Sequence, residues 1–161
     1  MDQLEFIKFG SNDFDDYFRL VSNEKVMAMI TERAIPLHEA RENFEKILRR
    51  NEKFEDFGTF KVLVQSTGEF IGLGSLTRNE DQNDEAEIGY MLLPEQWGKG
   101  YGKIIAGRLL HRAEQSDVTR LTAIIDPANI PSRSILISQG FISEKVCEIG
   151  GLPGEILCKT L

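Results

Sequence analysis

Hydrophobic positions recur along the chain with two different periods, and these periods predict its strands and helices. Apolar and polar residues alternate, or apolar residues run together, in several segments of strand length. Strands are predicted over residues 4–9, 57–65, 69–77, 85–93, 120–126, 141–149 and 155–161. Apolar residues three or four positions apart predict helices over residues 12–21, 26–30, 36–49, 98–114 and 131–139.

The order of these elements predicts the fold class. A strand, helices, three strands, a helix, a strand, a helix and two strands indicate a single α/β (α+β) domain over residues 1–161. We expect one mixed, mostly antiparallel central sheet of about six to seven strands, flanked by helices on both faces. The crossover through the helix over 98–114 makes strands 85–93 and 120–126 parallel neighbours. Gly107 inside this helix predicts close packing against the sheet.

A glycine-rich turn after strand 85–93 is the strongest candidate for chemistry. Its glycines Gly98, Gly100 and Gly102 alternate with Lys99, Tyr101 and Lys103. Glycine permits positive φ and close approach to a ligand, and unpaired N–H groups at a helix start bind phosphate oxygens. The turn also lies at the carboxyl end of a strand, where open α/β sheets bind ligands. We interpret it as a pyrophosphate cradle; the alternative is a connection that only lets the helix fold back on the sheet.

Two better-known phosphate motifs do not match this turn. The dinucleotide fingerprint that begins at Gly98 would need a glycine where the chain has Lys103. A P-loop needs four residues between its glycines and then Lys-Ser/Thr, and the turn meets neither condition. A nicotinamide-dependent reductase is therefore disfavoured.

Composition and charge narrow the possible partners. The chain of 161 residues has a net charge of −7, whereas nucleic-acid surfaces need an excess of Lys and Arg. An acidic body with a locally basic turn suits a small anionic cofactor and favours a cationic acceptor such as an amine. No stretch has the length and apolarity of a membrane span, and the first residues lack a signal-peptide pattern. We therefore expect a cytoplasmic protein with no nucleic-acid or membrane partner.

Histidines and cysteines predict no metal site. His38 and His111 each lack a second ligand at metal spacing. If residues 150–153 form a hairpin loop, antiparallel counting pairs Cys147 with Ile156 rather than with Cys158. We therefore expect neither a metal nor a disulfide.

Two separated motifs occur at a fixed distance in the chain. The first is Glu87-Ile88-Gly89-Tyr90-Met91-Leu92-Leu93-Pro94 followed by Trp97-Gly98-Lys99-Gly100-Tyr101-Gly102. The second is Asn129-x-x-Ser132 followed by Gly140-Phe141. Together with the element order, they resemble the GNAT superfamily of acyl-CoA-dependent N-acetyltransferases, in its ribosomal-protein N-acetyltransferase-like branch, whose Gln/Arg-x-x-Gly-x-Gly/Ala segment is similar to the first motif. Since the element order also matches from end to end, the resemblance covers nearly the whole chain.

The resemblance implies acetyl-CoA as cosubstrate and a set of binding residues. Backbone amides of Gly98, Lys99, Gly100, Tyr101, Gly102 and Lys103 would hold the pyrophosphate. The strand end at Met91, Leu92 and Leu93 would pair with the pantetheine arm, and an N–H near Leu92 would polarise the thioester carbonyl. Asn129 and Ser132 would contact the pantetheine or adenosine side; without the resemblance they would be a turn residue and a helix start.

The chain departs from the family pattern at two positions. Trp97 stands at the Gln/Arg position, a change of little weight if backbone amides bind the phosphates. Leu136 stands where relatives often carry a tyrosine, which leaves open how the departing thiolate is protonated.

The implied reaction is attack by a neutral amine on a thioester, so a group must accept a proton from the ammonium. Glu87 is the candidate base, acting directly or through water. Alternatively, its carboxylate only forms an ion pair with Arg78 or lies at a solvent-exposed strand end, or Glu85 is the base instead. Ser132 or Ser134 would donate a proton to the departing thiolate. Alternatively, Ser132 only begins a helix and Ser134 only lies on its surface, or the reaction needs no acid.

The function that follows is an N-acetyltransferase working by direct attack in a ternary complex. Its acceptor, a protein N-terminus or a small-molecule amine, would contact residues 22–40 and 150–154. A non-catalytic acyl-CoA-binding or sensing domain is the alternative, and we expect a monomer or homodimer.

Overall fold

The computed structural model describes residues 3–82 and 84–161, and its elements follow the predicted order. Within these ranges the strands are β1 (Leu4–Lys8), β2 (Gly58–Val64), β3 (Phe70–Arg78), β4 (Glu85–Leu92), β5 (Arg120–Ile125), β6 (Ile142–Ile149) and β7 (Leu152–Thr160). The helices are α1 (Phe14–Val21), α2 (Glu24–Met27), α3 (Leu37–Lys53), α4 (Tyr101–Glu114) and α5 (Ile130–Ser138). Short 3-10 turns, η1 and η2, cover Ser11–Asp13 and Pro94–Gln96.

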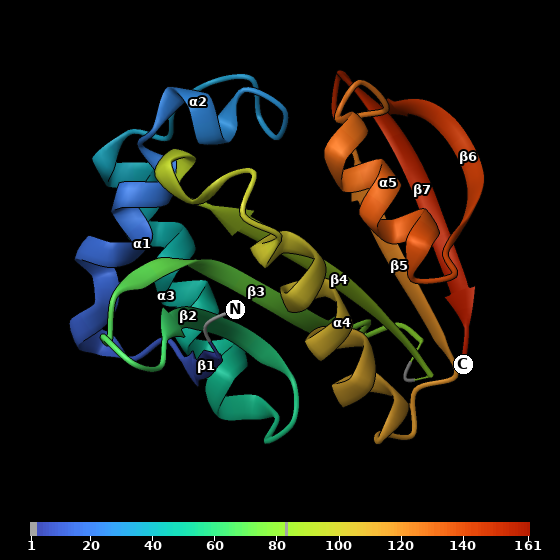
Figure 1. Cartoon of the computed structure of the whole chain (residues 1–161), viewed down its shortest axis with the longest axis horizontal. Helices are drawn as coiled ribbons and strands as arrows, with labels where there is room; N and C mark the ends of the chain where they lie inside the picture. Colours follow the sequence, from blue (N-terminus) through green and yellow to red (C-terminus); the bar gives the residue numbers. More distant parts are fainter. Residues whose placement is uncertain (1–2, 83) are drawn as a thin grey trace.

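The strands form one sheet in the order β1-β2-β3-β4-β5-β7-β6. Neighbouring strands are antiparallel except β4 and β5, which are parallel, as the crossover through α4 predicts. In Figure 1, α4 and α5 lie on one face of the sheet and α3 lies behind it. The predicted mixed, mostly antiparallel sheet with helices on both faces is confirmed.

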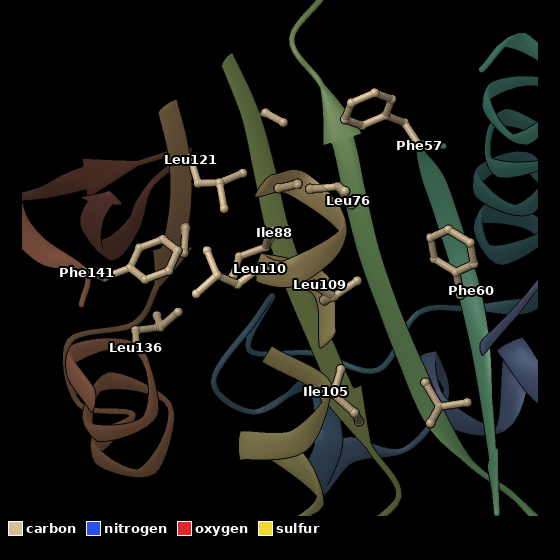
Figure 2. Packing of buried hydrophobic residues seen from close by; sticks show 14 of the residues in the cluster. Phe57, Phe60, Leu76, Ile88, Ile105, Leu109, Leu110, Leu121, Leu136 and Phe141 are labelled. Atoms are coloured by element: carbon tan, nitrogen blue, oxygen red, sulfur yellow. The ribbon is translucent and has the colours of Figure 1, made fainter. Parts of the chain in front are cut away.

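Each face of the sheet has its own hydrophobic core. Under α4 and α5, Ile88, Ile105, Leu109 and Leu136 belong to one buried cluster, several of whose members are shown in Figure 2. On the other face, a second cluster joins α1 and α3 to the sheet, and Phe44 of α3 contacts aromatic rings of α1 at its centre. The helices are thus held by apolar stripes at helical spacing.

The close approach between helices lies at Gly102 and not at Gly107. A Cβ added to Gly107 would have only the Gln139 side chain as a neighbour, at 3.8 Å. A Cβ added to Gly102 would lie 3.1 Å from Ile135 Cδ1. The expectation that Gly107 packs against the sheet is wrong because this position faces the end of α5.

Most element boundaries differ from the sequence prediction by one to four residues: α2, for example, spans Glu24–Met27 rather than 26–30, and α3 continues to Lys53 rather than 49. Two of the differences affect the glycine turn and the pairing of the last strands. Helix α4 begins at Tyr101 because Gly98 and Gly100, with φ of +76° and +86°, form the turn before it. Strand β7 begins at Leu152, so Cys147 pairs with Gly154 and not with Ile156 as counted from a longer loop. Both cysteines are free, as expected.

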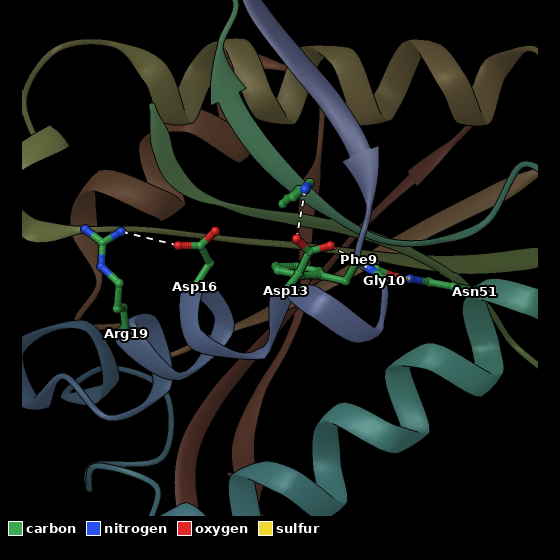
Figure 3. A network of polar contacts seen from close by, with 7 residues as sticks. Phe9, Gly10, Asp13, Asp16, Arg19 and Asn51 are labelled. Carbon is green, nitrogen blue, oxygen red and sulfur yellow. Dashed lines mark hydrogen bonds and ion pairs between the residues drawn. The ribbon is translucent and has the colours of Figure 1, made fainter. Parts of the chain in front are cut away.

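Asn51, near the end of α3, clamps the helix to two strands. Its Oδ1 accepts from the Thr59 N–H at 2.8 Å, and its Nδ2 donates to the carbonyls of Phe9 and Thr59 at 3.2 and 3.1 Å. Beside it, Asp13 accepts from the Gly10 N–H and from Lys61 Nζ (Figure 3). Beyond the end of β1, where the pairing between β1 and β2 stops, these side-chain hydrogen bonds satisfy the backbone groups instead.

Candidate functional site

Strands β4 and β5 diverge, and this opens one edge of β4. They pair only from Glu85 to Glu87 of β4, whereas β4 stays paired with β3 as far as Leu92. The Leu93 N–H bonds to β3, and ladder bonds alternate along an antiparallel pair. The N–H and C=O groups of Tyr90 and Leu92 therefore point into the gap. The Leu92 carbonyl confirms this direction, since it accepts from Trp97 Nε1 at 2.9 Å.

The glycine turn presents free N–H groups next to this open edge. No side chain caps the start of α4, and the first helical bond, from the Ile104 N–H to the Gly100 carbonyl, is long at 3.4 Å. The N–H groups of Tyr101, Gly102 and Lys103 have no acceptor within the helix. Free N–H groups at a helix start are suited to bind an anion, which is the role that the sequence analysis expects for this turn.

The start of α5 forms the opposite wall. Asn129 caps this helix, because its Oδ1 accepts from the Ser132 N–H at 3.3 Å. The next turn is tied to β7 by Arg133, whose Nε donates to both oxygens of the buried Glu155 at 3.0 and 3.2 Å. Hydrogen bonds from Ser143 and Arg133 hold the pKa of Glu155 below its usual range. The wall is therefore fixed relative to the sheet.

These parts enclose one cleft of about 620 Å³. Ten of the predicted site residues line it: Met91, Leu92, Trp97, Gly98, Gly100, Tyr101, Gly102, Lys103, Asn129 and Ser132. A glycine cradle, an open strand edge and an apolar wall are the groups needed to bind a phosphate-bearing ligand with an extended amide-containing arm. The described residues fit acetyl-CoA in this respect.

Four predicted residues lie outside the cleft lining. Leu93 is buried and bonded to β3, and Lys99 is exposed, with its Nζ 3.3 Å from Gln96 Oε1. Ser134 is exposed on α5. Glu87 lies on β4 at the last position paired with β5, on the face that carries Met91 and α3 rather than on the α4 face.

The surroundings of Glu87 set the charge state of its carboxyl. Partial burial raises the pKa of Glu87, and the positive charge of Arg50 acts in the opposite direction. The side chain nevertheless reaches water, because the solvent-accessible surface of Glu87 is that of an exposed residue. Arg78 forms its ion pair with Asp117 and not with Glu87. The carboxyl is thus available to accept a proton.

Several lining residues were not predicted as site residues. Tyr90 projects from β4, and its hydroxyl is buried with no hydrogen-bond partner. Val26, Met29 and Ile30 form an apolar edge within the segment expected to contact an acceptor. The only signal for Tyr90 was a hydroxyl-bearing side chain inside an apolar strand, which is weak without knowledge of its neighbours.

Gly98→Ala is expected to weaken acetyl-CoA binding about tenfold or more. Gly98 has a φ of +76° and nothing within 4 Å of an added Cβ, so the change acts through backbone strain, about 1 kcal/mol, and through the cradle itself. Gly68→Ala is the matched control, with a φ of +74° and equally open space in the β2–β3 turn. Calorimetry and urea unfolding should show similar losses of stability but a loss of affinity only at Gly98; equal affinities would contradict the cradle.

In the part of the chain that the structure describes, no helix is long and apolar enough to cross a membrane. The same residues contain no group of three or more His, Cys, Asp or Glu side chains arranged to hold a metal ion.

The chain is similar to known proteins both in sequence and in structure. Residues 3–142 match the family model described as an acetyltransferase (GNAT) domain. An uncharacterized N-acetyltransferase, p20, of Bacillus licheniformis is 34% identical over 86 residues, which are 53% of this chain and 48% of that protein. The chain thus spans about half the length of the curated relatives it matches.

Solved structures share the fold. A spermidine N-acetyltransferase of Vibrio cholerae, in complex with CoA and spermine, superposes with a TM-score of 0.81 over 98% of this chain and 95% of its own, at 18% identity. An acetyltransferase of the GNAT family from Bacillus anthracis gives a TM-score of 0.79 over 99% and 96%, at 19% identity. At these identities the likeness establishes the architecture.

Proposed function

The chain belongs to the GNAT acetyltransferase family, and from this premise we propose that it transfers an acetyl group from acetyl-CoA to a primary amine. The observation that carries the proposal is the cleft in which the free N–H groups of the α4 start lie beside the open edge of β4. A fold alone does not fix a reaction, but this edge and cradle suit the two ends of acetyl-CoA.

In the proposed complex, binding is carried by the backbone. The N–H groups of Tyr101, Gly102 and Lys103 donate hydrogen bonds to the pyrophosphate oxygens, and the Lys103 ammonium adds positive charge beside them. The open edge at Tyr90 and Leu92 bonds to the amides of the pantetheine arm. The N–H of Tyr90 or Leu92 then polarises the thioester carbonyl, where negative charge develops during attack.

Glu87 prepares the amine in this proposal. It lies where β4 and β5 part, on the face opposite α4, so an amine reaching the thioester through the gap would pass near its carboxyl. The raised pKa of Glu87, caused by burial, brings a carboxylate closer to the basicity that a general base needs. Glu87 takes one proton from the ammonium, directly or through water.

The charges that line the cleft also indicate which kind of amine is the acceptor. Its described lining residues include Lys25 and Lys103 but no carboxylate. The related structure with spermine concerns a spermidine N-acetyltransferase, and polycations of that kind need acidic partners. We therefore propose an acceptor with a single amine, such as a protein N-terminus: Glu87 would face that amine, and the described lining of the cleft adds no second carboxylate for a polycation. The resemblance to the ribosomal-protein branch supports this choice, and small monoamines belong to the same class.

One observation favours a second function, a non-catalytic acyl-CoA sensor. Leu136, at the position where relatives often carry a tyrosine, is fully buried in the core under α5. A sensor would bind acetyl-CoA without needing a proton donor. Binding without turnover would identify it.

The proposed transferase is tested by its product. Purified protein is incubated with isotope-labelled acetyl-CoA and a panel of N-terminal peptides, monoamines and polyamines, and mass spectrometry identifies labelled amides. We expect a labelled amide from at least one peptide or monoamine, in preference to polyamines. If every amine remains unlabelled while acetyl-CoA binds, the sensor replaces the transferase.

A further inference from the structure

We propose that Tyr90 is a catalytic residue that donates the proton to the leaving sulfur of CoA, in place of the tyrosine that α5 lacks at Leu136. The proposal rests on the acetyl transfer proposed above. It assigns a role to a hydroxyl of β4 that neither the sequence motifs nor the family match singles out.

The first observation is an orphan hydroxyl. The Oη of Tyr90 is buried and has no hydrogen-bond partner among the described residues. A buried polar group without a partner costs about 1–3 kcal/mol, so such groups need an explanation. Since Tyr90 also lines the cleft, a ligand atom in the cleft would supply the missing acceptor.

The second observation is the position of the ring. A Cβ added to Gly102, at the start of α4, would lie 3.8 Å from Tyr90 Cε2 and 3.1 Å from Ile135 Cδ1 of α5. The Tyr90 ring therefore lies beneath the first turn of α4 and close to α5. Gly102 leaves room for it, which gives that glycine a second use besides the cradle.

The third observation is a neighbouring hydroxyl. Burial raises the pKa of Tyr90, and proximity to Ser132 Oγ offsets part of this increase, although no hydrogen bond of normal geometry joins the two. Tyr90 therefore stays protonated at neutral pH and available as a donor. Ser132 lines the same cleft and is partly exposed, so its hydroxyl is placed to relay a proton between Tyr90 and solvent in the proposed step.

The other candidate donors on α5 fit less well. Ser134 is exposed and outside the lining, and Leu136, at the position of the family's tyrosine, has no hydroxyl and lies in the core. The Tyr90 backbone already borders the gap that receives the pantetheine arm. Its side chain thus approaches the thioester end of the arm from the α5 side, while Glu87 lies on the other face of β4.

The proton balance of the step is complete. The amine nitrogen attacks the thioester carbon and forms the C–N bond, and the C–S bond breaks with its electron pair passing to sulfur. Tyr90 Oη–H gives its proton to that sulfur, which leaves as the CoA thiol. The tyrosinate regains a proton from the second hydrogen lost by nitrogen, relayed through Ser132 Oγ or water. The first hydrogen is the one taken by Glu87.

The test is Tyr90→Phe, which keeps the ring and removes only the orphan hydroxyl. We expect kcat to fall at least about tenfold, with the Kd for acetyl-CoA unchanged and the melting temperature unchanged or higher. Tyr17→Phe, a buried tyrosine of α1 outside the cleft, is the matched control and should keep full kcat. Full kcat in Tyr90→Phe would overturn the proposal.

A change of leaving group separates proton donation from a structural effect. With acetyl-seleno-CoA the selenolate leaves without protonation, so Tyr90→Phe and wild type should react at nearly equal rates. An equal loss with both cosubstrates would overturn the role of Tyr90.

A third measurement tests the role of Tyr90 independently of the proposed acetyl transfer. If wild type binds CoA but acetylates no amine, the pKa of the bound thiol is followed by thiolate absorbance. Tyr90→Phe should raise it by about one unit if Tyr90 donates to sulfur. An unchanged thiol pKa, or no CoA binding at all, would rule out the contact.

Discussion

Glu87→Gln is expected to lower kcat about 100-fold while the Kd for acetyl-CoA stays the same, because a general base contributes at least that much and Glu87 lies outside the cleft that binds the cofactor. Glutamine keeps the size and hydrogen-bonding ability of the side chain, so the fold should not change. Steady-state kinetics and calorimetry on the same preparations measure the two quantities separately.

The pH profile gives this prediction a second readout. Burial raises the pKa of Glu87 above its usual 4.5, and the carboxyl acts as a base only when deprotonated. In wild type, kcat/KM should therefore fall as the pH drops through a value above 4.5. In Glu87→Gln this acid limb should disappear.

The raised pKa of Glu87 also makes the stability of the fold depend on pH, and this contribution decreases as the pH rises. The folded state holds the Glu87 proton more tightly than the unfolded state, so this group stabilises the fold below pH 4.5. Its contribution is lost as the pH rises through the raised pKa.

A matched variant controls for the loss of charge. Glu95→Gln removes a carboxylate from the exposed turn between β4 and the glycines, outside the cleft lining. It should keep kcat within about twofold, the size of a surface charge effect. A wild-type rate in Glu87→Gln would assign the base role to water or to another residue.

Asn51→Ala is expected to cost about 3 kcal/mol of unfolding free energy. The Asn51 amide makes three hydrogen bonds with the backbone of Phe9 and Thr59, both buried, and alanine leaves the Thr59 N–H and the Phe9 carbonyl without these partners. Each buried orphan costs about 1–3 kcal/mol. No repacking can replace them readily, because the backbone of Gly58 lies directly against Asn51: a Cβ there would be 2.3 Å from Asn51 Oδ1.

Urea unfolding and thermal melting measure this loss. For a chain of this size, about 3 kcal/mol corresponds to a fall of roughly 6–12 °C in melting temperature. Glu52→Ala, the next residue of α3 and exposed, should change stability by less than about 0.5 kcal/mol. A loss below about 1 kcal/mol in Asn51→Ala would show that water satisfies these groups.

Sequence pattern was sufficient for the elements and for the glycine turn, because both depend on local chemistry. Alternation, helical spacing and glycine content act over a few residues, so the parallel pair around the crossover and the positive-φ turn at Gly98 and Gly100 could be predicted. Burial near the helix ends was not predictable from the pattern. Leu37 keeps the apolar spacing of the helix predicted over 36–49, but it is 48% exposed in the first turn of α3 because spacing does not show which residues another element covers.

Features that depend on distant partners could not be read from the pattern. The Asn51 clamp joins residues more than forty positions apart in sequence. The unpaired hydroxyl of Tyr90 results from the packing of α4 and α5 beside β4, which the sequence pattern does not show. Similarly, Glu87 was predicted as a base from its place on the strand, but the face on which it lies follows from Met91, four residues further on, which packs against the cluster under α1 and α3.

The most direct measurement is a calorimetric titration of wild type with acetyl-CoA, followed in the same samples by thiol release with and without N-terminal peptides and monoamines. We predict one binding site and release that depends on the amine. Binding without amine-dependent release would contradict catalysis, and no binding would contradict the assignment of the cleft between β4 and α5.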